Sequence, residues 1–166
     1  MNTQSLIETL PTLWSELVLG APADATGTYM LNIGDQGLLR SLDALSASDA
    51  SATSQAGASI AAHVEHVRYG LSLMNRWASE GGNPFADAKW DEAWKTSHVD
   101  DGEWSEIRGG LRDEAQRWLG VLGTGREVST VELNGMIASI AHLAYHLGAI
   151  RQIASSARGP REGTFA

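Results

Sequence analysis

The sequence predicts an all-α protein, a four-helix bundle with short extra helices in its loops. Four segments repeat apolar residues at spacings of three and four positions, which is the period of an amphipathic helix. Sustained alternation of apolar and polar residues, the pattern of a strand, occurs nowhere in the chain. Because each amphipathic helix must bury its apolar stripe, packing the four stripes against one another is the natural arrangement.

The first helix is expected over about residues 3–19, where Pro11 is expected to kink or restart it. Its apolar stripe contains Leu10, Leu13, Trp14 and Leu17. A turn over residues 34–37 then leads into a short helix with four leucines on one side, between positions 38 and 45. Residues 46–59 are rich in Ser, Ala and Asp and predict a loop with about one helical turn.

The second long helix is expected to begin after Ser59, a good N-cap residue, and to end near Ala78 before a Gly-Gly-Asn-Pro sequence. Residues 85–101 are irregular and rich in tryptophan. Acidic residues at positions 100–103 suit the start of the third helix, which continues to about Leu122. The longest helix follows from about Ser129 to Ser156.

Length and charge limit the classes of protein that the chain can belong to. Its 166 residues predict one domain, which we place at residues 1–157, followed by a flexible tail at 158–166. The formal charge is −8, from 12 Lys and Arg against 20 Asp and Glu, so we expect no nucleic-acid partner and no membrane partner. The chain has no cysteine, which excludes disulfides, Cys-ligated zinc and a thiol nucleophile.

The first twenty residues do not have the pattern of a signal peptide. They lack a basic segment and carry Glu8 and Glu16 within their apolar stretch. No continuous apolar run is long enough to span a bilayer. We therefore expect a cytoplasmic protein.

Four of the five histidines fall in two of the predicted helices. His142 and His146 stand four positions apart, so their imidazoles lie on one face of the last helix and can reach one metal ion at about 2.0–2.1 Å. Both lie about 90–130° around the helix from the centre of its apolar arc. His66 has a similar offset in the second helix, and His63 lies nearer the middle of its stripe. Three imidazoles at the rim of a cleft suit a metal ion with an open position.

The same histidines have a simpler interpretation, in which each has its own backbone or carboxylate partner. The pair in the last helix lacks the glutamate of the H-E-x-x-H zinc motif, because Leu143 stands at that position. The Glu-x-x-His pattern of di-iron bundles is also missing. No nucleophile elbow, phosphate loop or dinucleotide fingerprint is present.

Three further residues are candidates for a pocket beside the metal site. Gly70 follows His66 by one turn, where the missing side chain leaves room for a ligand or for close helix packing. Trp77 lies on the same edge of the second helix as His66, although a tryptophan there is more often part of the core. Arg151 is placed to guide an anionic substrate, or is a solvated charge near the helix end.

Residues 59–67, SIAAHVEHV, and residues 142–152, HLAYHLGAIRQ, resemble the DinB/YfiT-like metalloenzyme superfamily. In that family, a three-histidine metal site is marked by two motifs. One is a small residue seven positions before a histidine of the second helix, and the other is an H-x-x-x-H on the last long helix. The likeness covers about residues 29–156 and is specific in its two motifs.

The resemblance implies a four-helix bundle of up-down-down-up order, often dimeric, that holds zinc or nickel. The implied metal ligands are His66, His142 and His146, where His66 is preferred because Ser59 stands seven positions before it. His63 is then an alternative ligand or a residue that supports a ligand from behind. Characterised relatives include thiol-dependent transferases and isomerases, so a low-molecular-weight thiol is a further candidate cofactor.

We therefore expect a metal-dependent enzyme with a small-molecule substrate. It would act as a thiol-dependent S-transferase or as a hydrolase that uses metal-bound water. A homodimer is expected as well. The alternative is a non-catalytic, dimeric helical bundle that binds a metal ion or a small ligand. A fourth protein ligand would indicate a structural site, whereas an open position indicates catalysis.

Overall fold

The computed structural model describes residues 3–53 and 57–160, with side chains from residue 8 onward. Over these residues its regular secondary structure is helical, with seven α-helices and no strand, and the pair Thr53 and Ser59 forms one isolated β-bridge. The predicted all-α class is confirmed. The long helices are α1 (Thr3–Leu19), α4 (Ile60–Glu80), α6 (Asp101–Leu122) and α7 (Thr130–Ile153). The short elements are α2 (Gly37–Asp43), α3 (Ala47–Ala50), α5 (Trp90–Ala93) and the 3-10 turn η1 (Ser155–Ala157).

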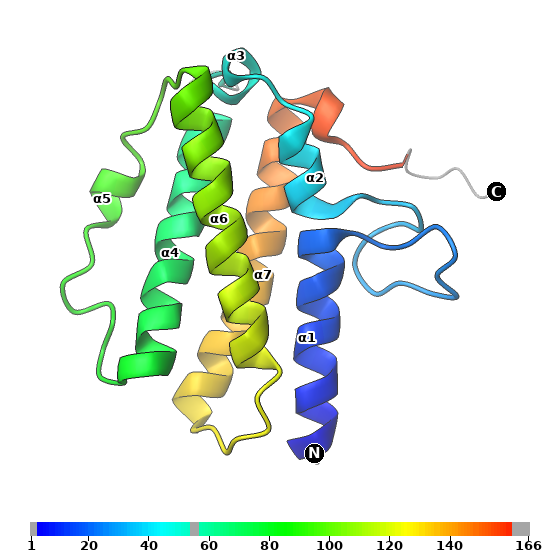
Figure 1. The fold of residues 1–166 in the computed structure, drawn as a ribbon, viewed down its shortest axis with the longest axis vertical. Coiled ribbons are helices and arrows are strands. Elements are labelled where there is room, and N and C mark those ends of the chain that lie inside the picture. The colour runs from blue at the N-terminus through cyan, green and yellow to red at the C-terminus, as the bar shows by residue number, and fades with distance from the viewer. Residues whose placement is uncertain (1–2, 54–56, 161–166) are drawn as a thin grey trace.

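The four long helices lie side by side (Figure 1). In that view α1 and α7 run upward and α4 and α6 run downward. Helix α4 packs against α6 and α7, and α1 packs against the same two helices. Their apolar sides enclose one core, which α2 and α3 close at one end with the predicted leucines Leu38, Leu42 and Leu45.

Three tryptophans fill the centre of this core, and each satisfies its indole N–H. Trp14 donates to the carbonyl of Ala115 at 3.1 Å. Trp104 donates to the carbonyl of Leu45 at 2.9 Å, and Trp118 donates to Ser139 Oγ at 2.8 Å. Because a buried N–H without a partner is destabilising, these bonds fix which helix segments face one another.

The helix starts agree with the capping pattern of the sequence. Ser59 caps α4 by accepting from the N–H of Ala62. Helices α6 and α7 begin with capping boxes, in which Asp100 and Ser129 each exchange hydrogen bonds with the residue three positions on. Of the two outcomes expected at Pro11, the restart is wrong, because α1 continues through this proline as one helix from Thr3 to Leu19.

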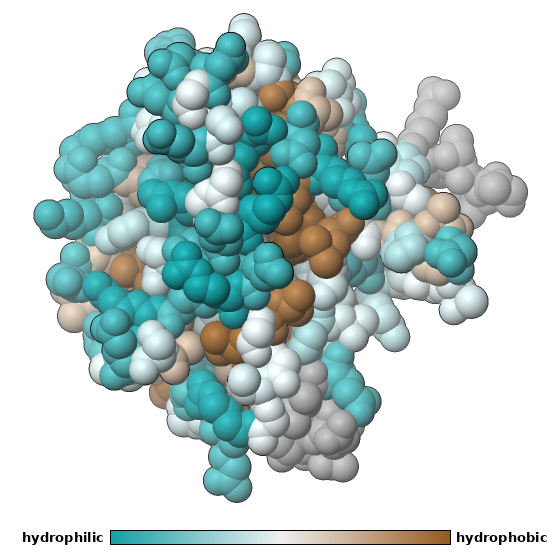
Figure 2. All heavy atoms as spheres, in the orientation of Figure 1, coloured by the Kyte–Doolittle hydropathy of each residue, from teal (hydrophilic) through white to brown (hydrophobic). Residues whose placement is uncertain are grey.

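The outer surface is mainly hydrophilic on the face shown in Figure 2, and apolar side chains emerge in a band between α6 and α1. No helix in the described part of the chain is long and apolar enough to cross a membrane. Of the expected tail, Arg158 donates from Nε to the carbonyl of Arg151 at 3.0 Å. Positions 161–166 lie outside the described residues.

Candidate metal centre

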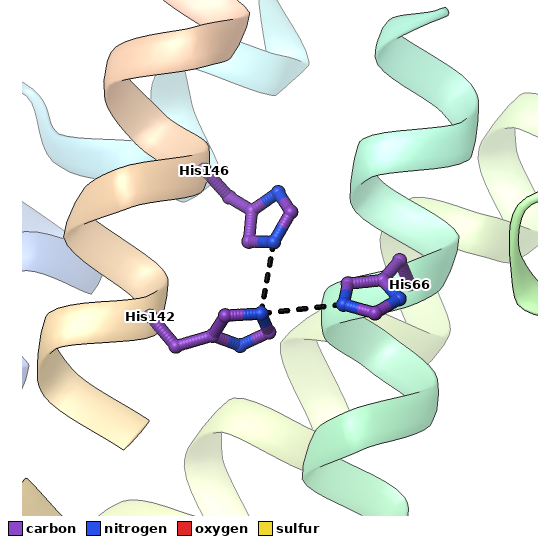
Figure 3. A group of neighbouring side chains, drawn as sticks. All are labelled: His66, His142 and His146. Atoms are coloured by element: carbon purple, nitrogen blue, oxygen red, sulfur yellow. Dashed lines mark hydrogen bonds between the residues drawn. The ribbon is translucent and has the colours of Figure 1, made fainter. Parts of the chain in front are cut away.

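Three histidines from two helices converge on one point. His66 comes from α4, His142 and His146 come from α7, and the three rings face into the space between these helices (Figure 3). The Nε2 atom of His142 lies 3.2 Å from Nε2 of His66 and 3.0 Å from Nε2 of His146. One ligand nitrogen from each residue lies within 4.8 Å of the other two. As predicted from their spacing of four positions, His142 and His146 therefore lie on one face of α7 with nitrogens close enough to reach one metal ion.

Hydrogen bonding alone does not account for this cluster. Each nitrogen of a neutral imidazole carries either one hydrogen or one lone pair, so the Nε2 atom of His142 can make one well-directed hydrogen bond. It nevertheless faces two nitrogens at hydrogen-bond distance. A metal ion removes the conflict, because all three lone pairs can point at it. Nitrogens bound to tetrahedral zinc stand about 3.3 Å apart, close to the observed separations.

Burial favours the neutral, metal-binding form of these rings. Burial, followed by repulsion from His142 and His63, lowers the pKa of His66 to about 4. Burial, followed by repulsion from the other three histidines, lowers the pKa of His146 to about 3. Burial also lowers the pKa of His63, and the neighbouring side chains that surround part of the His142 ring lower the pKa of His142 by desolvation, although the residue as a whole is exposed. All four rings are therefore neutral near pH 7, and only a neutral imidazole has the lone pair that binds a metal ion.

His63 lies behind His146 rather than in the group of converging nitrogens. The Nδ1 atoms of His63 and His146 are 2.9 Å apart, on the opposite edge of the His146 ring from its Nε2 atom. If His146 binds a metal through Nε2, its remaining proton is on Nδ1 and is donated to His63. The sequence leaves two roles open for His63, a metal ligand or a residue that hydrogen-bonds to a ligand. The geometry supports the second role, with His146 as the ligand.

Two tryptophans of the irregular segment cover the histidines. The ring of Trp94 stacks on His66 with centroids 4.3 Å apart and planes at 25°, and its edge contacts His63 at 5.4 Å. Trp90 lies 5.4 Å from His66. Sequence reasoning missed both residues, since helical periodicity is absent there. The cluster of tryptophans was the available signal.

The segment that carries these tryptophans, residues 84–100, is tied to α4 and its cap by several hydrogen bonds, one of which joins Arg76 to the carbonyl of Pro84 at 2.9 Å. The N–H of Lys89 donates to the Tyr69 hydroxyl oxygen at 2.9 Å. The hydroxyl of Ser59 donates to the carbonyl of Thr96 at 3.0 Å. Because Lys89 precedes Trp90 and Thr96 follows Trp94, these two bonds hold the segment across α4 on both sides of the tryptophans.

One side of the cluster remains open. His146 is fully buried and His66 is 9% exposed, whereas His142 is exposed. Within the described residues, no carboxylate and no further histidine joins the three nitrogens as a potential ligand. His98, the fifth histidine, is exposed on the loop before α6 and is not in the group. The arrangement therefore supplies three potential protein ligands, of which His142 lies on the solvent side.

The three pocket candidates lie in different surroundings. A Cβ atom built on Gly70 meets only the ring of Trp90, at 3.8 and 3.9 Å, so this glycine faces a cavity and not a neighbouring helix backbone. Trp77 packs against Gly135 of α7 and against the hydrophobic core, so it is part of the helix packing. The guanidinium of Arg151 is bound to Asp35 at 2.7 Å and to the carbonyl of Ala157, so the structure does not bring it to the histidines.

Comparisons of the chain with models of protein families, with curated proteins and with solved structures gave no match.

Proposed function

We propose that this protein is a metal-dependent enzyme that holds one divalent ion on His66, His142 and His146. The observation that carries the proposal is the convergence of their Nε2 atoms, with separations of 3.0 and 3.2 Å about His142. Three imidazoles without a carboxylate favour zinc or nickel over magnesium or calcium, which prefer oxygen ligands. Zinc or nickel is therefore the proposed metal.

The proposal includes a DinB-like four-helix bundle. Its support is the packing of α4 and α1 against both α6 and α7, together with the opposite directions of α1 and α7 on one hand and α4 and α6 on the other. A bundle of this kind places metal ligands on facing helices in its interior. Here the ligands come from α4 and α7, which pack against each other.

The open side favours catalysis over a structural metal site. Structural zinc sites are closed by four protein ligands, whereas catalytic sites keep one position for water or substrate. A divalent ion held by three neutral imidazoles lowers the pKa of a water molecule or a thiol that takes the open position. We therefore propose transfer of a low-molecular-weight thiol, or hydrolysis, as the class of reaction.

The chain's own residues would prepare the site for this chemistry. His63 holds His146 in the tautomer whose Nε2 lone pair points at the metal position. Trp94 covers the face of His66 and excludes water from it. The exposed edge of His142 leaves the approach for substrate from the solvent side.

We also propose that the protein is a homodimer, as the resemblance implies. Residues 133–150 of α7 contain no Asp, Glu, Lys or Arg. Val131, Ile137 and Tyr145 are exposed on this helix. A helix that is apolar on its outer side as well as its inner side is expected to bury both.

Light scattering tests the proposed dimer. The wild type should have twice the chain mass, and Ile137→Glu should have the mass of one chain. A monomeric wild-type protein contradicts this part of the proposal.

The zinc and nickel content of protein purified without a histidine tag tests the metal site. We expect one zinc or nickel ion per chain in the wild type and none in His142→Ala, because two remaining imidazoles bind either ion weakly. His98→Ala is the matched control and should keep one zinc or nickel ion, since His98 lies outside the group. Circular dichroism establishes that each variant is folded. Full zinc or nickel content in folded His142→Ala overturns the proposed site.

Catalysis needs an exchangeable position, which cobalt-substituted protein reports. We expect a small thiol added to the cobalt protein to produce a sulfur-to-cobalt charge-transfer band. A cobalt spectrum that no thiol, azide or change of pH alters would indicate a closed site, and the enzymatic part of the proposal would then be wrong.

A further inference from the structure

A cavity of about 250 Å³ lies between α4 and α7, directly beside the proposed metal position. Its wall includes Val67, Gly70, Phe85, Trp90, Ala138 and His142. His142 thus contributes to both sites: its ring lines the cavity, and its Nε2 atom faces the two other ligand nitrogens. Trp90 also links them, because its ring contacts His66 and stands opposite Gly70.

The wall of this cavity is apolar. No Asp, Glu, Lys or Arg lines it among the described residues. Its one hydroxyl, that of Ser139, donates to the carbonyl of Met136 at 2.7 Å and accepts from the indole N–H of Trp118 at 2.8 Å. A polar group entering the cavity would lose its hydrogen bonds to water and find few replacements, which disfavours polar ligands. Apolar groups meet no such penalty.

The absence of a side chain at Gly70 keeps the cavity open. A Cβ atom at this position has only the Trp90 ring within 4 Å, and that ring is at ordinary contact distance. Close helix packing therefore does not explain this glycine. By contrast, a Cβ atom on Gly135 across the same cavity would come within 2.8 Å of the Trp77 ring, so that glycine is required by packing.

We propose that this cavity binds an apolar group of the substrate, about the size of an aromatic ring, while the polar head of the same molecule reaches the metal position beside His142. An enclosed apolar cavity of roughly 150 Å³ accommodates benzene, and this cavity of about 250 Å³, which is open to solvent beside Phe85 and Ala138, has room for a substituted ring. The inference rests on the proposed metal-dependent function for the role of the head. The binding of the apolar part depends on the cavity alone.

Three small molecules distinguish binding of the apolar group in the cavity from binding of the polar head at the metal position. 4-Fluorotoluene has a ring and no metal-binding head, 4-fluorobenzyl mercaptan has both, and 2-mercaptoethanol has the head without the ring. Fluorine NMR titration measures the first two, and competition against the fluorinated thiol measures the third. We expect fluorotoluene to bind the wild type with or without zinc. We expect the fluorinated thiol to bind the zinc protein more tightly than either of the other probes.

A variant with a larger side chain in the cavity tests whether the probes bind there. Gly70→Leu places an isobutyl group beside Trp90 and should weaken both fluorinated probes by about tenfold or more. Zinc content and the affinity for 2-mercaptoethanol should stay at wild-type values. Gly109→Leu is the matched control, a glycine inside α6 with no atom within 4 Å of its Cβ position, and it should bind the probes as the wild type does. Ala138→Leu fills the same cavity from α7 and replaces Gly70→Leu if that variant does not fold.

The outcomes distinguish the two proposals. Failure of fluorotoluene to bind the wild type, or wild-type binding by both filled variants, overturns the cavity assignment even if zinc is bound. Absence of zinc together with fluorotoluene binding that Gly70→Leu weakens supports the cavity and contradicts the metal site.

Discussion

The Nδ1 atom of His63 lies 2.9 Å from the Nδ1 atom of His146, on the edge of the His146 ring that points away from His142. His63 would therefore act on the proposed metal position through His146. Residues behind a metal ligand orient it and raise its basicity, and their loss typically weakens metal binding about 10–100-fold.

His63→Leu should accordingly lower the affinity for zinc by about 10–100-fold without changing the ratio of one zinc ion per chain. Competition with a chelator measures the affinity. His63→Asn keeps a hydrogen-bond acceptor near the Nδ1 position and should recover most of it. If His63→Leu loses zinc as completely as His142→Ala, His63 is itself a ligand.

The metal-free protein should lose stability as the pH falls from 6.5 toward 5. His66 and His146 stay neutral in the folded protein down to about pH 4 and 3, whereas an unfolded histidine takes up a proton near pH 6.5. The unfolded state binds more protons in this window, so the free energy of unfolding rises with pH and is fully restored above it.

Urea denaturation at several pH values measures this slope. The double variant His66→Asn/His146→Asn has no proton to bind at these positions and should show a flatter dependence between pH 5 and 6.5. A metal-free wild type that is equally stable at both pH values would contradict the burial of neutral imidazoles.

Two glycines that line the same cavity should respond oppositely to alanine. Gly70→Ala should stabilise the protein by about 0.5–1 kcal/mol, because alanine loses less backbone entropy in a helix and its methyl group fits beside Trp90. Gly135→Ala gains the same entropy but places Cβ within 2.8 Å of the Trp77 ring. It should therefore be less stable than Gly70→Ala by about 1–3 kcal/mol. Equal stability of the two variants, by chemical denaturation, would show that Trp77 does not pack as described.

The ion pair between Arg151 and Asp35 should matter for stability and not for the metal. Its side chains are 15% and 3% exposed and 2.7 Å apart, so Arg151→Met leaves a buried carboxylate unpaired and should cost about 3–5 kcal/mol. Asp35→Asn in the same chain removes that charge and should recover most of the loss. Zinc affinity measured under folding conditions should equal the wild-type value. A large loss of affinity would instead place Arg151 near the site.

Much of the fold is predictable because it depends on local patterns. The caps at Ser59, Asp100 and Ser129 satisfy N–H groups within three residues of each helix start, so they appear directly in the sequence. The continuity of α1 at Pro11 is different. A proline inside a helix is locally unfavourable, yet α1 continues past it and packs against α2, α6 and α7, contacts that no local pattern reports.

In the candidate site, too, some features follow from the local sequence and others depend on contacts between distant segments. The pair His142 and His146 follows from helix geometry alone, and the helical offset of His66 places it toward them. Trp94 stacks on His66 from an irregular segment, which is held across α4 by a hydrogen bond from the Lys89 N–H to Tyr69 and by one from Ser59 to the Thr96 carbonyl. The role of His63 likewise depends on how α4 is rotated against α7, which sets the side of His146 that it meets.

X-ray absorption spectroscopy at the zinc edge, on zinc-loaded protein without a tag, tests the central claim most directly. The account predicts three imidazole nitrogens at about 2.0–2.1 Å, with the multiple scattering typical of histidine, and a further light atom that a small thiol replaces with sulfur. A shell with fewer than three imidazoles, or one that is unchanged in His142→Ala, would contradict it.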